Sequence, residues 1–260
     1  MSDRPKIELK KGIYIFPSLF TCGNMAFGIL SIMSSIDYHF IQAAWLLTLA
    51  LACDILDGRI ARMTHTTTDF GLQLDSLSDL VSFGIAPALM IYMLVLKDMG
   101  KIGVAIAVLF VLCSALRLAR FNVMALKGIS FENFKGLPTP ASAGVLISFV
   151  LSYQLLGPEG VSLNFNTIPS LMKTMPVFFN AMPIIMVILS FLMVSNVPYY
   201  SFKHMRLTRT RTIRLLVLLI VLAILIIVFP QNVFFVIFVV YTLSGFFMLA
   251  LSVFKKRRTA

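Results

Sequence analysis

Long apolar stretches, separated by short polar or basic segments, make up most of this 260-residue chain. Each stretch is close to the ~20 residues that a helix needs to cross about 30 Å of hydrocarbon. The candidate spans are roughly residues 15–36, 40–60, 74–96, 102–124, 139–156, 177–198, 213–230 and 232–254. The pattern predicts an all-α integral membrane protein with about eight transmembrane helices.

The composition agrees with this interpretation and excludes an ordinary soluble domain. Hydrophobic residues make up 59% of the chain, charged residues only 13%, and the mean hydropathy is +0.93. Soluble domains are less apolar and carry about twice this share of charge. A net charge of +11 would also suit a nucleic-acid-binding protein, so the positions of the charges have to decide.

Lysine and arginine are sorted to one side of the predicted membrane. Of the 22 basic residues, 19 fall in five segments: 1–13, 57–73, 117–137, 199–214 and 255–258. The other three are Lys97, Lys101 and Lys173. Cytoplasmic loops carry the excess of Lys and Arg, so both termini and the 57–73 loop are expected in the cytoplasm. The net positive charge is then explained by the membrane topology and by attraction to anionic membrane lipid, and we expect no nucleic-acid partner.

The same pattern predicts how the chain is divided. Residues 1–13 form a basic cytoplasmic N-terminus, and residues 14–198 form a six-helix catalytic membrane core. Residues 199–260 form a basic linker followed by a C-terminal pair of transmembrane helices.

The stretch from residue 54 to residue 79 concentrates negative charge between two apolar segments. Five of the 11 acidic residues lie in it, and four of them, Asp54, Asp57, Asp75 and Asp79, form two closely spaced pairs. Spacings of three and four place each pair on one helix face, where like charges repel, and charge is costly near a bilayer. Hard divalent cations bind carboxylate oxygens, and Mg²⁺ is often shared between carboxylates and a substrate phosphate. The stretch therefore predicts a metal site built from two helix ends, and solvated carboxylates without a ligand are the alternative.

The residues between the carboxylates suit a phosphate ligand. Gly58 lets a ligand approach the backbone, and Arg62 lies one turn further, where it can pair with a phosphate. The whole pattern is D-x2-D-G-x2-A-R-x8-G-x3-D-x3-D. It resembles, position for position, the signature of the CDP-alcohol phosphotransferase family of membrane enzymes.

The resemblance implies an activity and a metal site. Enzymes of this family transfer a phosphatidyl group from a CDP-linked lipid to an alcohol and release CMP. By the family pattern, two divalent ions, Mg²⁺ or Mn²⁺, are held by Asp54, Asp57, Asp75 and Asp79, and Asp79 is also the general base. The sequence leaves open whether attack is direct or passes through a covalent intermediate.

The resemblance also implies contacts to the CDP-lipid. The expected contact residues are Gly58, Ala61, Arg62, Thr68, Gly71, Thr21 and Asn24. Thr21 and Asn24 belong to a stretch similar to the family's P-N-x-x-T-x-x-N opening, in which Ser18 replaces the usual Asn. Hydroxyls and amides are also common in helix packing, and that alternative stays open for Thr21 and Asn24.

Three further segments bear on the acceptor alcohol. The stretches SLSDLVSFGIAPA after Asp75, ALRLARFN at 115–122 and FKGLPTPASAG at 134–144 resemble bacterial-type phosphatidylserine synthases within the family. This likeness implies CDP-diacylglycerol as donor, L-serine as acceptor, a homodimer, and a multi-pass protein of the cytoplasmic (inner) membrane whose active site faces the cytoplasm. The expected serine-binding residues are Arg117, Arg120, Asn122, Lys135 and Ser82. An arginine can bind the serine carboxylate, although Arg117 and Arg120 would also mark a cytoplasmic membrane edge.

Three alternatives remain at this point. The acceptor could be glycerol 3-phosphate or inositol phosphate, which also require cations. The donor could be an ether lipid. A divalent-cation channel or transporter would also place acidic residues in a membrane, but it gives no role to Gly58 and Arg62 and would hold its carboxylates near the midplane.

Overall fold

The computed structural model describes residues 7–64, 68–126, 136–154, 177–197, 235–242 and 244–245. Every regular element in these ranges is helical and none is a strand, which confirms the predicted all-α class. Four helical segments are long and apolar enough to cross a membrane: Ser18–Ile36, Phe40–Ile60, Asp69–Met99 and Lys101–Ala125. They match the first four predicted spans. The predicted span 213–230 lies outside the described residues, as does most of 232–254.

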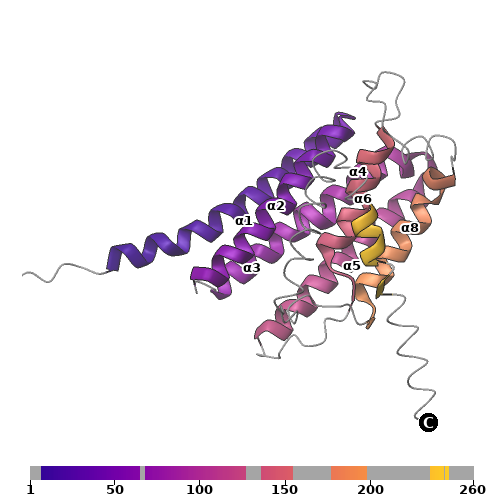
Figure 1. The fold of residues 1–260 in the computed structure, drawn as a ribbon. Helices are drawn as coiled ribbons and strands as arrows, with labels where there is room; N and C mark the ends of the chain where they lie inside the picture. The colour runs from indigo at the N-terminus through magenta and orange to yellow at the C-terminus, as the bar shows by residue number, and fades with distance from the viewer. Residues whose placement is uncertain are drawn as a thin grey trace, which may run out of the picture. The chain divides into compact units, whose positions relative to one another are not determined.

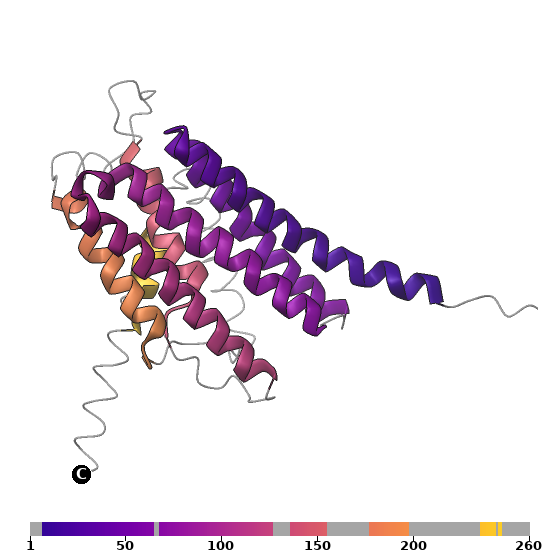
Figure 2. The same cartoon turned by 180° about the vertical axis from the view of Figure 1, so that it is seen from behind.

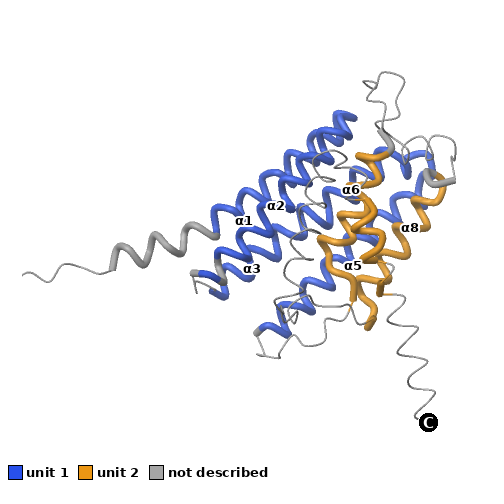
Figure 3. The backbone as a smooth tube through the Cα atoms, in the orientation of Figure 1, with its two compact units in different colours: residues 1–129 blue, residues 130–260 orange. Residues whose placement is uncertain are grey.

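The chain separates into two compact units, Met1–Ile129 and Ser130–Ala260 (Figure 3). Unit 1 contains α1 (Ile7–Ile36), α2 (Phe40–Thr64), α3 (Asp69–Asp79) and α5 (Lys101–Leu126). Helix α1 packs along α2 on one side and against α3 on another (Figures 1 and 2). The aspartates lie on α2 and α3, and both of these helices pack against α1.

The third membrane segment is longer than predicted and changes its helical form along its length. After α3 it continues as a π-helical turn, η1 (Leu80–Ile85), then as α4 (Ala86–Ile91), η2 (Tyr92–Leu96) and η3 (Lys97–Met99). It begins at Asp69 because the Thr68 hydroxyl accepts a 3.0 Å hydrogen bond from the Gly71 N–H and caps the first turn. It ends at Gly100, whose φ of 58° and ψ of −126° suit glycine alone.

Small and polar residues line the buried face of α1. Thr21, Asn24, Ser31 and Ser35 are all buried at helical spacing, with Gly28 between them. The hydroxyls of Ser78 and Ser82 donate to the carbonyls of Thr21 (3.0 Å) and Asn24 (2.9 Å), and Ser31 donates to the carbonyl of Ala43 in α2 (3.0 Å). Small residues let helix backbones come close enough for such bonds.

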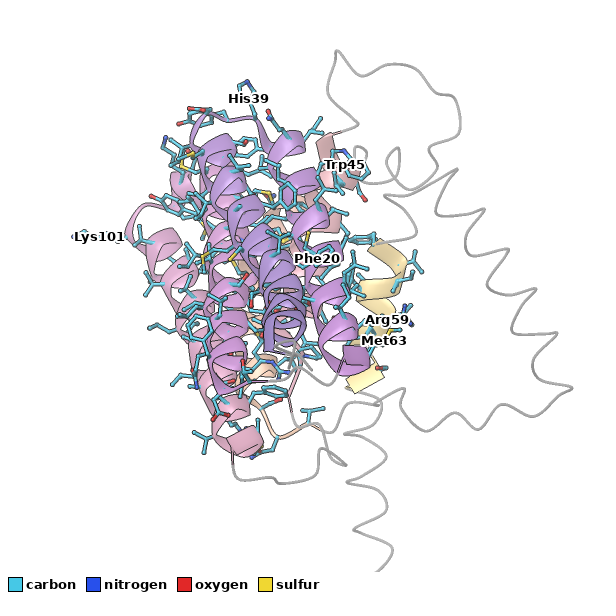
Figure 4. All side chains as sticks on the ribbon, turned by 90° about the vertical axis from the view of Figure 1, so that its left-hand side faces the viewer. Phe20, His39, Trp45, Arg59, Met63 and Lys101 are labelled. Carbon is cyan, nitrogen blue, oxygen red and sulfur yellow. The ribbon has the colours of Figure 1, made fainter. Side chains whose placement is uncertain are left out.

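The two ends of unit 1 differ in chemistry. At one end the Lys97 ammonium donates a 2.6 Å hydrogen bond to the Tyr38 hydroxyl, which ties the α1–α2 turn to η3. Figure 4 places His39 of that turn at one end of α2, with Arg59 and Met63 toward the other. The aspartates of α2 lie in the half that contains Arg59.

Unit 2 contains α6 (Thr139–Gln154) and α8 (Val177–Val194), which overlap the predicted spans 139–156 and 177–198. Both are apolar but shorter than the four membrane-length segments of unit 1. The N–H of Leu137, just before α6, donates to the Leu192 carbonyl (3.0 Å), and the Ser142 hydroxyl contacts the Met193 sulfur at 3.1 Å. These bonds join α6 to α8 within the unit.

The close approach at Gly28 predicts a destabilising substitution. A methyl group in Gly28→Ala would clash with the Ser82 side chain and lie 2.9 Å from its Cα, so α1 would have to move away from η1. We expect a loss of about 1–3 kcal/mol, measured as a lower unfolding temperature in detergent. Gly23→Ala is the matched control, because among the described residues its methyl would come within 4 Å only of the Cys53 sulfur, at 3.7 Å. Equal unfolding temperatures for the two variants would contradict the packing argument.

Candidate active site

Three aspartates from two helices come together in unit 1. Asp54 and Asp57 lie in the C-terminal half of α2, and Asp75 lies in α3. Carboxylate oxygens of the three side chains all lie within 4.8 Å of one another. Asp57 is only 4% exposed, whereas Asp54 and Asp75 are half-buried. The sequence spacing predicted a site of four aspartates, and three of them form this cluster, which we call the carboxylate trio.

The fourth aspartate is placed differently. Asp79 ends α3, is 8% exposed, and accepts a 3.3 Å hydrogen bond at Oδ1 from the side-chain amide of Asn24 in α1. It is not a member of the trio, but Asp54, Asp75 and Asp57 all repel it electrostatically. The structure therefore separates three carboxylates that share one position from a fourth that an amide holds beside them.

The trio fits a hard divalent cation. Its donor atoms are all carboxylate oxygens, which is the ligand type preferred by Mg²⁺ and Mn²⁺. Three carboxylates this close together, in apolar helices, repel one another when they are ionised, and a positive charge between them relieves the repulsion. A cation held by Asp54, Asp57 and Asp75 would provide this charge and would also attract the phosphates of a substrate.

The predicted CDP-lipid residues lie on the helices that carry the aspartates. Gly58 and the backbones of Ala61 and Arg62 belong to the end of α2, while Thr68 and Gly71 form the cap of α3. The side chains of Ala61 and Arg62 lie outside what the structure describes. Thr21 and Asn24 are buried on α1, where their carbonyls accept bonds from Ser78 and Ser82.

The predicted acceptor residues gather mostly on α5. Arg117 and Arg120 are half-buried there, and Asn122 is 8% exposed, whereas Lys135 lies outside the described residues. Ser82 is fully buried in η1, and its hydroxyl is bonded to the Asn24 carbonyl.

A polar network between α3 and α5 could not be found from the sequence. The Asn122 amide accepts a 2.9 Å bond from the Ser76 hydroxyl and donates a 3.3 Å bond to Gln73 Oε1. Ser76 is the neighbour of Asp75, so the network fixes the end of α5 relative to the trio. Nothing in the sequence pairs Gln73 or Ser76 with Asn122, and the packing of α3 on α5 brings them together.

The architecture and site together define a polytopic membrane protein with an acidic site of metal-binding type. Residues 14–171 match the family described as CDP-alcohol phosphatidyltransferase. The chain belongs to this family. It is a membrane-bound transferase of phospholipid biosynthesis, and the family depends on divalent metal, as the trio leads one to expect.

Individual relatives agree with this assignment. The chain is 34% identical over 257 residues to a CDP-diacylglycerol–serine O-phosphatidyltransferase of Helicobacter pylori, covering 95% of this chain and 98% of the relative. It is 44% identical over 138 residues to an archaetidylserine synthase of Methanothermobacter thermautotrophicus, covering 52% and 58%. A Bacillus subtilis CDP-diacylglycerol–serine O-phosphatidyltransferase is 32% identical over 137 residues, covering 53% and 76%.

The trio predicts a specific loss of metal affinity. We expect Asp75→Asn to weaken Mn²⁺ binding at least tenfold, because one of three clustered carboxylates loses its charge. Electron paramagnetic resonance of free Mn²⁺ in a titration of the detergent-solubilised protein would measure this. Asp69→Asn is the control, since Asp69 is exposed in the first turn of the same helix. Equal losses in both variants would remove the trio as the metal site.

Proposed function

We propose that this protein transfers the phosphatidyl group of CDP-diacylglycerol to the hydroxyl of L-serine, forming phosphatidylserine and CMP. The observation that carries the proposal is the similarity to the Helicobacter pylori serine O-phosphatidyltransferase over almost the whole of both chains. Donor and acceptor class therefore follow from a relative that shares the C-terminal part of the chain as well as the motif.

An ether-lipid donor is the second candidate, because an archaetidylserine synthase is 44% identical over its matched part. That match covers about half of each chain, and the serine acceptor would be the same. We favour the diacylglycerol donor because the Helicobacter pylori relative matches over 95% of this chain.

The proposed chemistry assigns the aspartates separate tasks. Asp54, Asp57 and Asp75 would hold divalent metal, Mg²⁺ or Mn²⁺, and Asp79 would contribute to a second metal position. Bound metal would neutralise the pyrophosphate and stabilise the departing phosphate. Asp79 accepts the proton of the serine hydroxyl. In a direct displacement, the serine oxygen bonds to the phosphorus that carries diacylglycerol, and the bond from that phosphorus to CMP breaks, leaving its electron pair on CMP.

Substrate contacts complete the proposal. Arg117 and Arg120 bind the serine carboxylate, and we assign Asn122, Ser82 and Lys135 to the serine side of the site as well. Arg62 pairs with the pyrophosphate, and Gly58 and Ala61 form a smooth surface for the cytidine or its phosphates. We assign Thr68, Gly71, Thr21 and Asn24 to the CDP-lipid side of the site.

We further propose the topology that the charge pattern predicts. About eight spans, divided as residues 14–198 and 199–260 after the basic segment 1–13, would place both termini and the carboxylates in the cytoplasm. The location would be the cytoplasmic (inner) membrane, whose anionic lipids attract the basic loops. The protein would act as a homodimer.

An acceptor panel tests the function. Purified protein with CDP-diacylglycerol and Mg²⁺ or Mn²⁺ should release CMP with L-serine and not with glycerol 3-phosphate, inositol or inositol phosphate. Chelation with EDTA should abolish the release, and adding back metal should restore it. CMP release with another acceptor would be compatible with the proposed metal site but would contradict serine as the acceptor. CMP release without metal would contradict the proposed mechanism. No CMP release with any acceptor would contradict CDP-diacylglycerol as the donor.

If Asp79 is the general base, replacing it should lower turnover without weakening the binding of CDP-diacylglycerol. Asp79→Asn should lower kcat by about 100-fold or more, because proton transfer by a positioned group contributes ~10²–10⁴-fold. Binding of CDP-diacylglycerol to the variant, measured by isothermal titration calorimetry, should change little. Asp98→Asn, at the opposite end of the same membrane segment, is the control. An Asp79→Asn variant with full turnover would rule Asp79 out as the base.

A further inference from the structure

The side-chain amide of Asn24, next to Asp79, forms a hydrogen bond through only one of its two polar atoms. Asn24 is fully buried on α1, and its Nδ2 donates the 3.3 Å bond to Asp79 Oδ1. Its other polar atom, Oδ1, is also buried and accepts no hydrogen bond within the described part of the chain. Buried carbonyl oxygens are seldom left without a donor because the loss of hydration is costly.

The position of this amide is fixed by bonds on both sides of Asp79. Ser78 and Ser82, which lie one residue before and three after Asp79, donate to the α1 carbonyls of Thr21 and Asn24. These bonds hold the α1 backbone against the helix that carries Asp79, and the missing side chain of Gly28 permits the approach. The backbone of Asn24 is thereby held beside Asp79, and the hydrogen bond from Nδ2 to Asp79 keeps Oδ1 close to the carboxylate.

The chemistry of the acceptor supplies a donor for this oxygen. In the proposed reaction the single proton of the serine hydroxyl goes to Asp79, so the hydroxyl cannot also donate to Asn24. The α-ammonium of serine is separated from that hydroxyl oxygen by two carbons and carries three N–H donors. Because Nδ2 and Oδ1 share one carbon, a group that bonds to Oδ1 lies close to Asp79.

We propose that Asn24 is a positioning and specificity residue. Its N–H orients Asp79 toward the acceptor hydroxyl, and its carbonyl oxygen accepts a hydrogen bond from the α-ammonium of the acceptor. This inference rests on the proposed function, and it moves Asn24 from the CDP-lipid side of the site to the acceptor side. It gives the protein a means of preferring an amino alcohol over an acceptor that lacks an amine.

The experiment compares L-serine with 3-hydroxypropionate, which is serine without its amino group. In Asn24→Leu, whose side chain has a similar size and no polar atom, the loss of Asp79 orientation lowers kcat. The loss of the ammonium contact raises the KM for serine about tenfold or more, as expected for a hydrogen bond to a charged group. The KM for CDP-diacylglycerol stays within about twofold. The preference for serine over 3-hydroxypropionate, taken from kcat/KM or from the inhibition constant of 3-hydroxypropionate, falls by the same factor of about ten.

Controls separate these effects from misfolding. Ser31→Ala removes another buried polar group from the same face of α1, one that bonds to the Ala43 carbonyl, and should change none of these constants. Unaltered Mn²⁺ affinity in Asn24→Leu shows that the trio is assembled. If Asn24→Leu does not fold, Asn24→Ser, which has a small polar side chain, takes its place with the same expectations.

Each outcome has one meaning. An unchanged KM for serine, or an unchanged preference for serine, overturns the ammonium contact. A rise in the KM for CDP-diacylglycerol instead assigns Oδ1 to the nucleotide lipid and also overturns the proposal. If the unsubstituted protein releases no CMP with serine, the proposed function itself fails, which the acceptor panel detects before any Asn24 variant is made.

Discussion

Repulsion among carboxylates within apolar helices is the constraint on which the rest of unit 1 depends. Asp54, Asp57 and Asp75 present oxygens within 4.8 Å of one another, and Asp79 lies close enough to be repelled by all three. Such an arrangement is unfavourable unless cations and hydrogen-bond donors compensate it. The fold provides a hydrogen-bond donor to Asp79, in the Asn24 amide, and the trio has the ligand chemistry to bind a divalent cation as its compensating charge.

Helix α1 makes this arrangement possible although it contributes no carboxylate. It packs against both α2 and α3, so it sets the distance between Asp57 and Asp75. Its buried face consists of small and polar residues, which lets the Ser78 and Ser82 hydroxyls reach its carbonyl oxygens. Hydrophobic contact alone distinguishes poorly between neighbouring helices in a bilayer, whereas such hydrogen bonds fix register and rotation. The geometry of the site is therefore determined in part by residues outside the signature.

Spacing in the sequence predicted the helical class, the first four spans and a site of four aspartates, of which Asp54, Asp57 and Asp75 are the three that cluster. These features follow from regular periodicity and from a motif with fixed intervals. The limits of the third span were predicted less well, because its start depends on the Thr68 cap and its end on Gly100. The bonds of Asn24 to Asp79 and of Asn122 to Gln73 and Ser76 were not predicted. They join residues about 50 positions apart, and only the packing of the helices brings these residues together.

The Asn122 network bears on how the acceptor side of the site is held. Asn122 was expected to contact serine, yet both atoms of its amide bond to α3, one of them to the residue that follows Asp75. An amide used in this way stabilises the position of α5, and with it Arg117 and Arg120, relative to the carboxylates. Two amides, Asn24 on α1 and Asn122 on α5, thus hold the neighbouring helices to the one that carries Asp75 and Asp79. Of these two amides, only that of Asn24 has a buried oxygen that accepts no hydrogen bond from the described residues. Asn24 is therefore better placed than Asn122 to bind the acceptor directly.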